Sequence, residues 1–361
     1  MTKKVDLNNI TTFKDLDSFG MIKYTSELPE QFEKALQIMR NFLLPPNFPI
    51  PKNIVISGTG GGSAIAGNMI TSLFFSEIKC PIFINQGYKL PGWVDRNTVV
   101  FSVTYSGNTE ETISTFKQAL KNRAKVIVIT TGGELASLAE ENYITIVDFP
   151  DEGMQARSAI AYLFVPILLI LERFGMINAQ PRKDLNEVIT LLKELRIEYG
   201  VENPTEKNQA KFIAQSLFNK IPIIYSSDEL TNVAAMRWKN QFAENSKILS
   251  HYNTFPELNH DEIVGWEAPI EKTKYWQPVF LKDKSDDIHV SKRMEITSEI
   301  ISNKVDNIIN INSKGNSSLA RLLSLIYLGD WVSIYLAFLY GIDPTPVNTI
   351  VKMKEMLKNS L

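Results

Sequence analysis

The chain contains 361 residues, and its 38 Lys and Arg against 40 Asp and Glu give a formal net charge of −2. A chain this close to neutral does not carry the strongly basic face that nucleic-acid binders need, so we expect no nucleic-acid partner. Hydrophobic residues make up 44% of the chain and charged residues 22%, which predicts a folded protein with a sizeable core. The length predicts two domains, or two halves of one double-layered fold.

Cysteine and histidine usage limits the metals that the chain can hold. The single Cys80 excludes an internal disulfide, and His251, His260 and His289 are too few soft ligands for a zinc or iron–sulfur site. Any metal would therefore have to be held mainly by oxygen, and we expect that neither a metal nor an organic cofactor is required. The polar N-terminal sequence lacks the apolar segment of a secretion signal or membrane anchor, which predicts a cytoplasmic protein. The most apolar stretch, 159–171, is too short to span a bilayer, so we expect a buried core helix and no membrane contact.

In the first part of the chain, predicted strands and helices alternate after an opening helix at 30–44. Apolar strands joined by helices of this length predict a parallel sheet covered on both faces, which is a doubly wound α/β unit. The predicted strands lie at 53–57, 82–85, 99–103, 125–130 and 145–147, and the predicted helices begin at about 63 and cover 109–121 and 133–140.

Residues 156–219 are predicted to be almost entirely helical, and the alternation then resumes. Predicted strands lie at 221–225, 276–281 and 305–311, and predicted helices at 230–245, 295–303 and 320–340. We therefore divide the chain into an N-terminal helical segment (1–52), a first α/β subdomain (53–180), a helical connection (181–220) and a second α/β subdomain with C-terminal helices (221–361).

The first stretch that carries chemistry runs from 57 to 63, between a strand and a helix, and reads Ser-Gly-Thr-Gly-Gly-Gly-Ser. Gly61 and Gly62 allow a close backbone approach, and the free N–H groups of the first helical turn suit a phosphate. The alternative is a tight turn with Ser63 as the helix N-cap. The stretch is neither a phosphate-binding P-loop, because no Gly-Lys-Ser/Thr follows, nor a dinucleotide fingerprint, because the expected acidic residue is missing.

The second stretch, 102–112, again follows a strand and opens a helix. Thr104, Ser106 and Thr109 bring three hydroxyls near one helix N-terminus, where they can bond phosphate oxygens with the support of the helix dipole. The alternative is a capping box in which Ser106, Thr109 and Glu110 satisfy the helix start.

These two stretches, S-G-N-T-E-E-T together with the upstream G-G-S-A-I, resemble the sugar isomerase (SIS) domain, which binds sugar phosphates. Four further segments, 153–157, 237–245, 256–263 and 343–347, resemble one branch of it, the bifunctional phosphoglucose/phosphomannose isomerases. The resemblance runs from about residue 53 to residue 354. It implies two doubly wound parallel-sheet SIS subdomains (αβα sandwiches) with connecting helices.

The sequence departs from the family pattern at three positions. Gly60 stands where the family usually has Met, Thr59 replaces a Gly, and Thr104 replaces a Ser. Because Ser63 and the hydroxyl at position 104 remain, we expect the phosphate cradle to be retained with a slightly altered shape.

The resemblance assigns the proton transfer between C1 and C2 to Glu244, since an aldose–ketose isomerase needs a carboxylate base beside a phosphate cradle. Glu257 and Glu262 are rivals as the base, although neither lies in the matching motif. Arg157 matches the arginine that stabilises the enediolate, a task suited to a planar cation. Each assignment has a structural alternative: a surface glutamate for Glu244 and a structural salt bridge for Arg157.

His260 matches the histidine that opens the sugar ring, because an imidazole passes protons near neutral pH. In the family this histidine reaches the site of the neighbouring subunit, which implies a homodimer. Lys354 aligns with a C-terminal active-site lysine, with Lys352 and Lys358 close by. His251 and His289 match no catalytic position and are expected to be structural.

The resemblance implies an isomerase that interconverts glucose 6-phosphate, and mannose 6-phosphate, with fructose 6-phosphate. Both aldoses lose their C2 stereocentre in the enediol, so one base serves both if the C2–C3 bond has room to rotate. A C-terminal threonine makes that room in the family, and Thr345 and Thr349 are the two candidates. The alternatives are a catalytically inactive sugar-phosphate sensor and another SIS enzyme, such as the isomerase lobe of glucosamine 6-phosphate synthesis.

Overall fold

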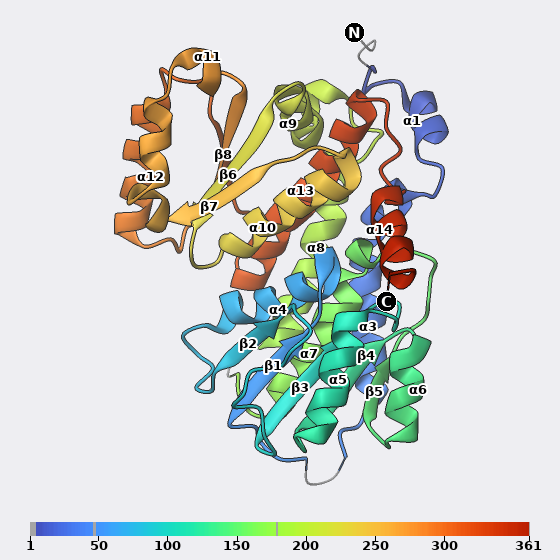
Figure 1. The fold of residues 1–361 in the computed structure, drawn as a ribbon. Coiled ribbons are helices and arrows are strands. Elements are labelled where there is room, and N and C mark those ends of the chain that lie inside the picture. Colours follow the sequence, from blue (N-terminus) through green and yellow to red (C-terminus); the bar gives the residue numbers. More distant parts are fainter. Residues whose placement is uncertain (1–4, 46–47, 178–179, 361) are drawn as a thin grey trace.

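The computed structural model describes residues 5–45, 48–177 and 180–360, and contains two sheets whose strands are all parallel (Figure 1). The strand orders are β2-β1-β3-β4-β5 and β7-β6-β8-β9. This confirms the predicted fold class of two parallel α/β sheets. The strands are β1 (Asn53–Ser57), β2 (Ile82–Asn85), β3 (Thr98–Val103), β4 (Lys125–Thr130), β5 (Thr145–Asp148), β6 (Ile221–Ser227), β7 (His251–Phe255), β8 (Trp276–Lys282) and β9 (Ile309–Asn312).

Helices follow or precede nearly every strand, and several pack between the two sheets. The α-helices are α1 (Ile10–Leu16), α2 (Met21–Ser26), α3 (Leu28–Asn41), α4 (Gly60–Phe74), α5 (Glu110–Lys121), α6 (Gly133–Glu141), α7 (Ile160–Arg173), α8 (Pro181–Tyr199), α9 (Gln209–Leu217), α10 (Asn232–Gln241), α11 (Ile270–Thr273), α12 (Ile288–Ile301), α13 (Ser318–Leu339) and α14 (Asn348–Lys358). Short 3-10 turns are η1 (Ala156–Ser158), η2 (Thr205–Lys207), η4 (Glu257–Asn259) and η5 (Glu262–Glu267), and η3 (Phe242–Ser246) is a π-helix.

Both faces of the first sheet are buried. Successive side chains of a strand point to opposite faces, so neighbouring residues of β1 lie in different clusters. Ile54 and Ile56 of β1 pack into the large core together with α4 and α7, whereas Val55 between them points to the cluster formed with α5 and α6. We call β1 through α7, residues 53–173, the first lobe.

The second sheet is built in the same way. Ile224 of β6 faces the core that contains α10 and α13, while Ile223 and Tyr225 face the cluster containing Val290 and Met294 of α12. We call β6 through β9, residues 221–312, the second lobe. Helices α8 and α9 connect the lobes along the chain and pack on α13.

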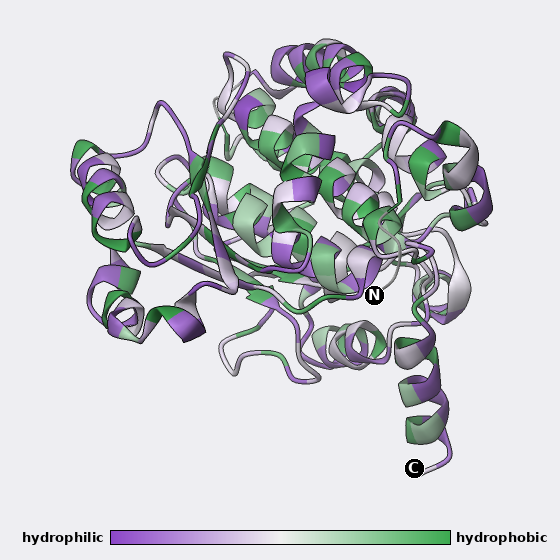
Figure 2. Cartoon of the chain, turned by 90° about the horizontal axis from the view of Figure 1, so that it is seen from above, coloured by the Kyte–Doolittle hydropathy of each residue, from purple (hydrophilic) through white to green (hydrophobic). Residues whose placement is uncertain are grey.

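One continuous core joins the two lobes, because α4 contacts α10, and α10 contacts α13. The apolar stretch expected to be a core helix forms α7, which is buried almost throughout. Among the described residues, α13 alone is long and apolar enough to cross a membrane by length and composition, but its most apolar window is entirely buried in the fold. In Figure 2 hydrophobic colour is concentrated on helices in the middle of the molecule, and α14, which ends at the C-terminus, projects away from them.

The observed elements differ from the predicted ones where tertiary contacts or helix caps set the boundaries of a strand or helix. The strand β7 was not predicted: it is a short edge strand with polar residues along it. Helix α12 begins seven residues before the predicted start at 295, because the Asp287 side chain accepts a hydrogen bond from the His289 N–H and caps it. The predicted helix 230–245 is divided into α10 and the π-helix η3.

Candidate active site

Two loops meet at the edge of the first sheet where β1 and β3 end. These strands are parallel neighbours, with Ser57 paired to Ser102, so the loops 57–63 and 102–109 leave the sheet side by side. The chain continues from β1 to β2 on one side and then to β3 on the other. Such a switch point at the carboxyl ends of the strands is where open α/β sheets bind ligands.

The glycine loop is packed so closely that side chains are excluded from it. A Cβ at Gly62 would lie 2.4 Å from the Ala156 carbonyl oxygen, and a Cβ at Gly61 would lie 2.8 Å from Glu244 Oε1. The N-cap of α4 is Thr59, without a side-chain capping bond, and Ser63 is the fourth residue of the helix. The alternative in which Ser63 caps the helix is therefore wrong. The first-turn N–H groups remain available to an anion.

The hydroxyl loop is likewise not a capping box. Helix α5 starts at Glu110, with Thr109 as an N-cap that makes no side-chain capping bond. The Thr104 and Thr109 hydroxyls instead bond to each other, with 2.8 Å between their Oγ1 atoms. Ser106 is exposed, and its Oγ accepts a 3.3 Å bond from the Asn108 N–H. The three predicted hydroxyls therefore lie in one loop beside the glycine loop, and none of them makes a side-chain capping bond to α5.

Glu244 lies in the π-helix η3, which continues α10. A π-helical turn widens the helix and re-aims its side chains, and such turns are frequent at functional sites. The Glu244 side chain is 24% exposed, and its Oε2 lies 3.4 Å from Arg157 Nη1. Its other oxygen faces Gly61, so the carboxylate is directed to the glycine loop and remains reachable from solvent.

Arg157 is fixed beneath this carboxylate by the turn η1. Its side chain is 2% exposed; Nε donates to Asn245 Oδ1 at 2.7 Å, and Nη2 donates to the carbonyl oxygens of Pro344 and Thr345 at 3.0 and 2.9 Å. Burial lowers the pKa of Arg157 and the charge of Glu244 works against that shift, and a guanidinium stays protonated in such surroundings. The arrangement presents the Nη1 group, with its positive charge, to Glu244. The structure thus brings together Gly61, Arg157 and Glu244.

Lys247 also lies at this site, although sequence reasoning missed it. Its Nζ donates to the Glu244 carbonyl oxygen and, at 3.0 Å, to the Pro344 carbonyl oxygen. Burial, followed by the charge of Arg157, lowers the pKa of Lys247 to about 8. In the sequence, the only indication that Lys247 belongs to the site is its position three residues after Glu244. Lys247 and Arg157 together hold the 343–346 loop against the site.

The two candidate threonines are separated by the structure. Thr345 is buried beside Arg157, and its Oγ1 has no hydrogen-bond partner among the described residues. Thr349 is exposed in the first turn of α14. Thr345 is therefore the threonine positioned at the site.

His260 is not brought to Glu244 within one chain. Strands β6 and β7 are parallel, so the segment between them, α10 and η3, brings the chain back to the end of the sheet where both strands begin. Strand β7 then carries the chain to the opposite end of the strands. His260 follows the far end of this five-residue strand, about 16 Å along it from the edge where η3 ends. The His260 side chain is exposed.

Lys354 is also not brought to the site. It lies on α14, none of whose residues is buried and which projects from the molecule (Figure 2). Lys352 and Lys358 are exposed on the same helix. The roles of His260 and Lys354 stay predictions.

The rival bases lie in the second lobe. Glu262 accepts hydrogen bonds from Tyr225 Oη at 2.7 Å and Asn253 Nδ2 at 2.5 Å, and its Oε2 lies 2.9 Å from His251 Nε2. Its oxygens are thus occupied by structural partners. Glu257 is exposed on η4. Neither glutamate approaches the glycine loop in any described contact.

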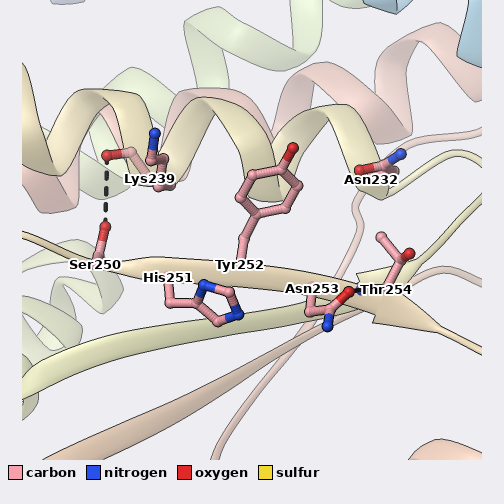
Figure 3. A pocket seen from close by; sticks show the side chains of 7 residues that line it. All are labelled: Asn232, Lys239, Ser250, His251, Tyr252, Asn253 and Thr254. Atoms are coloured by element: carbon pink, nitrogen blue, oxygen red, sulfur yellow. Dashed lines mark hydrogen bonds between the residues drawn. The ribbon is translucent and has the colours of Figure 1, made fainter. Parts of the chain in front are cut away.

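His251 and His289 have structural settings. A hollow of about 360 Å³ lies between α10 and β7. Figure 3 shows Tyr252 directed to α10, and His251 and Asn253 directed to the other side of the strand. This hollow contains neither glycine nor hydroxyl loop. His289 is exposed in the first turn of α12. The hollow is lined by Asn232, Lys239, Ser250, His251, Tyr252, Asn253 and Thr254.

The described part of the chain contains no group of three or more His, Cys, Asp or Glu side chains placed to hold a metal ion. The groups that the described residues present at the site are a carboxylate, a buried guanidinium, the Lys247 amine, hydroxyls and backbone N–H groups.

Comparisons with known proteins identify the class to which this site belongs. The SIS domain model matches residues 51–172, and the model of the bacterial phospho-glucose isomerase C-terminal SIS domain matches residues 206–357. A glucose-6-phosphate isomerase like protein from Thermus thermophilus has the same fold, with a TM-score of 0.60 and 22% identity over 94% of this chain and 98% of that one. The chain is thus a two-lobed SIS protein.

Two curated relatives narrow the class to one family. The chain is 43% identical to a bifunctional phosphoglucose/phosphomannose isomerase of Caldicellulosiruptor bescii, over 94% of this chain and 98% of the relative. It is 36% identical to one of Aquifex aeolicus, over 85% and 91% of the two chains. The chain belongs to the bifunctional phosphoglucose/phosphomannose isomerase family.

Proposed function

We propose that this chain is an aldose–ketose isomerase that interconverts glucose 6-phosphate, and also mannose 6-phosphate, with fructose 6-phosphate. The observation that carries the proposal is the Glu244 carboxylate held 3.4 Å from the buried Arg157 guanidinium, facing the glycine loop. The relatives at 43% and 36% identity support an enzyme rather than an inactive sugar-phosphate sensor. A sensor needs the phosphate cradle but has no use for a carboxylate aimed into it.

The phosphate end of the sugar is assigned to the two loops of the first lobe. The first-turn N–H groups of α4, beginning with Gly60–Gly62, and the hydroxyls of Thr104, Ser106 and Thr109 supply neutral donors. Neutral donors at a helix N-terminus bind a phosphate dianion without the desolvation that a buried lysine would need. We assign Ser63 to the same cradle.

The proton transfer is assigned to Glu244. Its carboxylate removes the proton from C2 of the open-chain aldose; the C2–H electrons form the enediol double bond while the C1 carbonyl oxygen takes up negative charge. The proton of the C2 hydroxyl moves to the C1 oxygen. The same carboxylic acid then returns its proton to C1 while the C2 carbonyl forms, giving the ketose. Arg157 Nη1, with its fixed charge, stabilises the enediolate oxygen. The Glu244 carboxylate is regenerated at the end of the cycle, and no co-reactant is consumed.

Mannose 6-phosphate fits the same scheme, because it differs from glucose 6-phosphate only at C2. Thr345 is our candidate for the room that the second epimer needs, because it is buried beside Arg157 and its hydroxyl has no hydrogen-bond partner within the described parts of the chain.

Ring opening requires a further proton carrier, and we assign it to His260 of a second subunit in a homodimer. The exposed imidazole and its distance from Glu244 within one chain support a contribution between subunits. We assign Lys354, on the projecting helix α14, to the site of the same dimer.

The test is a coupled assay that follows both aldose phosphates with the wild-type chain and the Glu244→Gln variant. Wild type should convert both sugars. For each sugar, the rate should be the same before and after treatment with a chelator. Glu244→Gln keeps the shape but loses the base, so kcat should fall at least about 1,000-fold while a phosphorylated competitive inhibitor still binds. Glu257→Gln, an exposed glutamate on η4, is the matched control and should remain fully active. An inactive wild type, or an active Glu244→Gln, would refute the proposal.

A further inference from the structure

A second arginine, Arg237, lies beneath the candidate active site without reaching it. Arg237 of α10 and Asp330 of α13 form a buried pair whose side chains are 1% and 6% exposed. The contact is bidentate: Nε donates to Oδ1 at 2.9 Å and Nη2 donates to Oδ2 at 2.7 Å. Removing two charges from water is costly, and apolar side chains of similar volume often replace such a pair without loss of stability. The pair therefore calls for an explanation other than stability.

The remaining N–H groups of Arg237 point to the first lobe. Nη1 donates to the Gly61 carbonyl oxygen at 2.7 Å, and Nη2 donates to the Arg157 carbonyl oxygen at 2.9 Å. Gly61 is the glycine that faces Glu244, and Arg157 is the cation beside it. The Arg237 guanidinium thus holds the backbone of both Gly61 and Arg157, the two residues that lie next to the catalytic carboxylate. Because Arg237 is on α10, these contacts connect them to the helix that precedes Glu244.

The contacts continue into a closed ring of hydrogen bonds. Arg157 Nε donates to Asn245 Oδ1, Asn245 Nδ2 donates to Ser333 Oγ at 2.9 Å, and Ser333 Oγ donates to the Asp330 carbonyl oxygen at 2.7 Å. Asp330 Oδ1 in turn accepts from Gln241 Nε2 at 2.8 Å, at the last residue before the π-helix. Glu244 lies between Gln241 and Asn245, so both sides of its turn are anchored to the ring.

We propose that Arg237 and Asp330 are positioning residues that set the separation and orientation of the Glu244 carboxylate and the Arg157 guanidinium. The inference deepens the proposed function and rests on it. Neither residue has a described contact with the glycine-loop face of Glu244; they act through the carbonyl oxygens of Gly61 and Arg157 and through the π-helix.

The chain offers a matched control for this pair. Arg321, also on α13, forms a buried pair with Asp283, with 7% and 0% of the side chains exposed and 2.8 Å between Nε and Oδ2. Its other partners are Asn316, Ser285 and Ser318, so it has the same chemistry without a contact to the site. Equivalent substitutions in the two pairs therefore separate positioning from the general cost of disturbing a buried ion pair.

The experiment compares Arg237→Lys with Arg321→Lys. A lysine keeps the charge but cannot donate to Asp330, Gly61 and Arg157 together in the planar geometry of the guanidinium. We expect Arg237→Lys to lower kcat about 100-fold with KM changed less than about threefold, because a displacement near 1 Å at the reacting groups has that effect. Arg321→Lys should leave kcat within about threefold of wild type, at a similar loss of thermal midpoint.

A second pair of variants covers the case in which Arg237→Lys does not fold. The neutral doubles Arg237→Met with Asp330→Leu, and Arg321→Met with Asp283→Leu, leave no unpaired buried charge. The first double should again lose kcat, and the second should not. Equal kcat losses in the two sets, or losses that follow the thermal midpoints, would overturn the positioning role.

Crystal structures of Arg237→Lys and Arg321→Lys give a readout that does not depend on activity. The distance between Glu244 Oε2 and Arg157 Nη1 should exceed 4 Å, the limit of an ion pair, in the first variant, and remain near 3.4 Å in the second. An unchanged distance in Arg237→Lys overturns this inference alone. A wild type that isomerises neither hexose phosphate overturns the proposed function, and the crystal structures still decide the positioning.

Discussion

The two lobes share the same order of strands and helices, but the residues that follow their strands are uncharged in the first lobe and mainly acidic in the second. In the first lobe, the loops 57–63 and 102–109 contain glycine, hydroxyl and other uncharged residues only. In the second lobe, β6 runs into Asp228 and Glu229, and β8 runs into Asp283, with Asp286 close behind. The same switch point of a parallel sheet is neutral in one lobe and acidic in the other.

The acidic edge disfavours anions. Burial, and then the neighbouring charges of Asp228 and Asp286, raise the pKa of Glu229, and burial raises the pKa of Asp286. A phosphate dianion beside Asp228 and Glu229 would meet the same repulsion. Lys282, Lys284 and Arg321 offset part of the negative charge at the end of β8. The comparison teaches that the fold offers two equivalent strand-end positions, and that side-chain chemistry favours the first lobe for the proposed phosphate site.

Among the substitutions that compare the two lobes, the largest effect is expected from filling the glycine loop of the first lobe. In Gly62→Ala the new Cβ would lie 2.4 Å from the Ala156 carbonyl oxygen, so backbone next to Arg157 must move. We expect kcat/KM to fall about 100-fold or more, measured in the coupled assay. Gly265→Ala in the second lobe, where a Cβ meets nothing within 4 Å, should leave the rate unchanged. Equal effects of the two substitutions would contradict the division between lobes.

A moderate effect is expected from removing one cradle hydroxyl. Thr104→Val keeps the shape and deletes the group that bonds to Thr109, so KM for the sugar phosphate should rise about tenfold with little change in thermal midpoint. The second-lobe counterpart is Ser226→Ala, at the end of β6, where the buried hydroxyl has no partner among the described residues. Its KM should equal that of wild type. A higher KM in Ser226→Ala would contradict the assignment of the phosphate to the first lobe.

The smallest effect concerns acid stability of the second lobe. Burial works to raise the pKa of Asp283, but hydrogen bonds from Ser285, Ser313 and Arg321 outweigh it, and the pKa is lowered. The unfolded chain then takes up its proton first as the pH falls. The stabilising contribution of this carboxylate is therefore complete above about pH 4 and is lost as the pH falls through the folded-state pKa.

Thermal midpoints measured between pH 3 and pH 6 check this expectation. Wild type should lose about 2 °C more below pH 4 than the neutral double Arg321→Met with Asp283→Leu, which lacks the carboxylate. Parallel curves for the two proteins would show that Asp283 does not contribute to acid unfolding.

Sequence patterns placed most of the first lobe correctly, for local reasons. The predicted strands 53–57, 82–85 and 125–130 coincide with β1, β2 and β4, since short apolar runs bounded by glycine and polar residues specify buried parallel strands. Glu244 and Arg157, assigned from a motif resemblance, do lie together. The capping alternatives for Ser63 and Ser106 failed, because cap geometry depends on where the first helical turn begins.

What the sequence alone determined is thus the alternation of strand and helix, the loops that end β1 and β3, and the choice of Glu244 and Arg157 as a candidate pair that the structure brings together. Only the tertiary structure decided the π-helical turn that aims Glu244, the buried partners of Arg237, the choice of Thr345, and the separation of His260 from the site within one chain. The reason is physical: strand and helix patterns reflect neighbours a few residues away. The contacts that orient Arg157 join residues 87, 88, 187 and 188 positions apart, and no local periodicity records them.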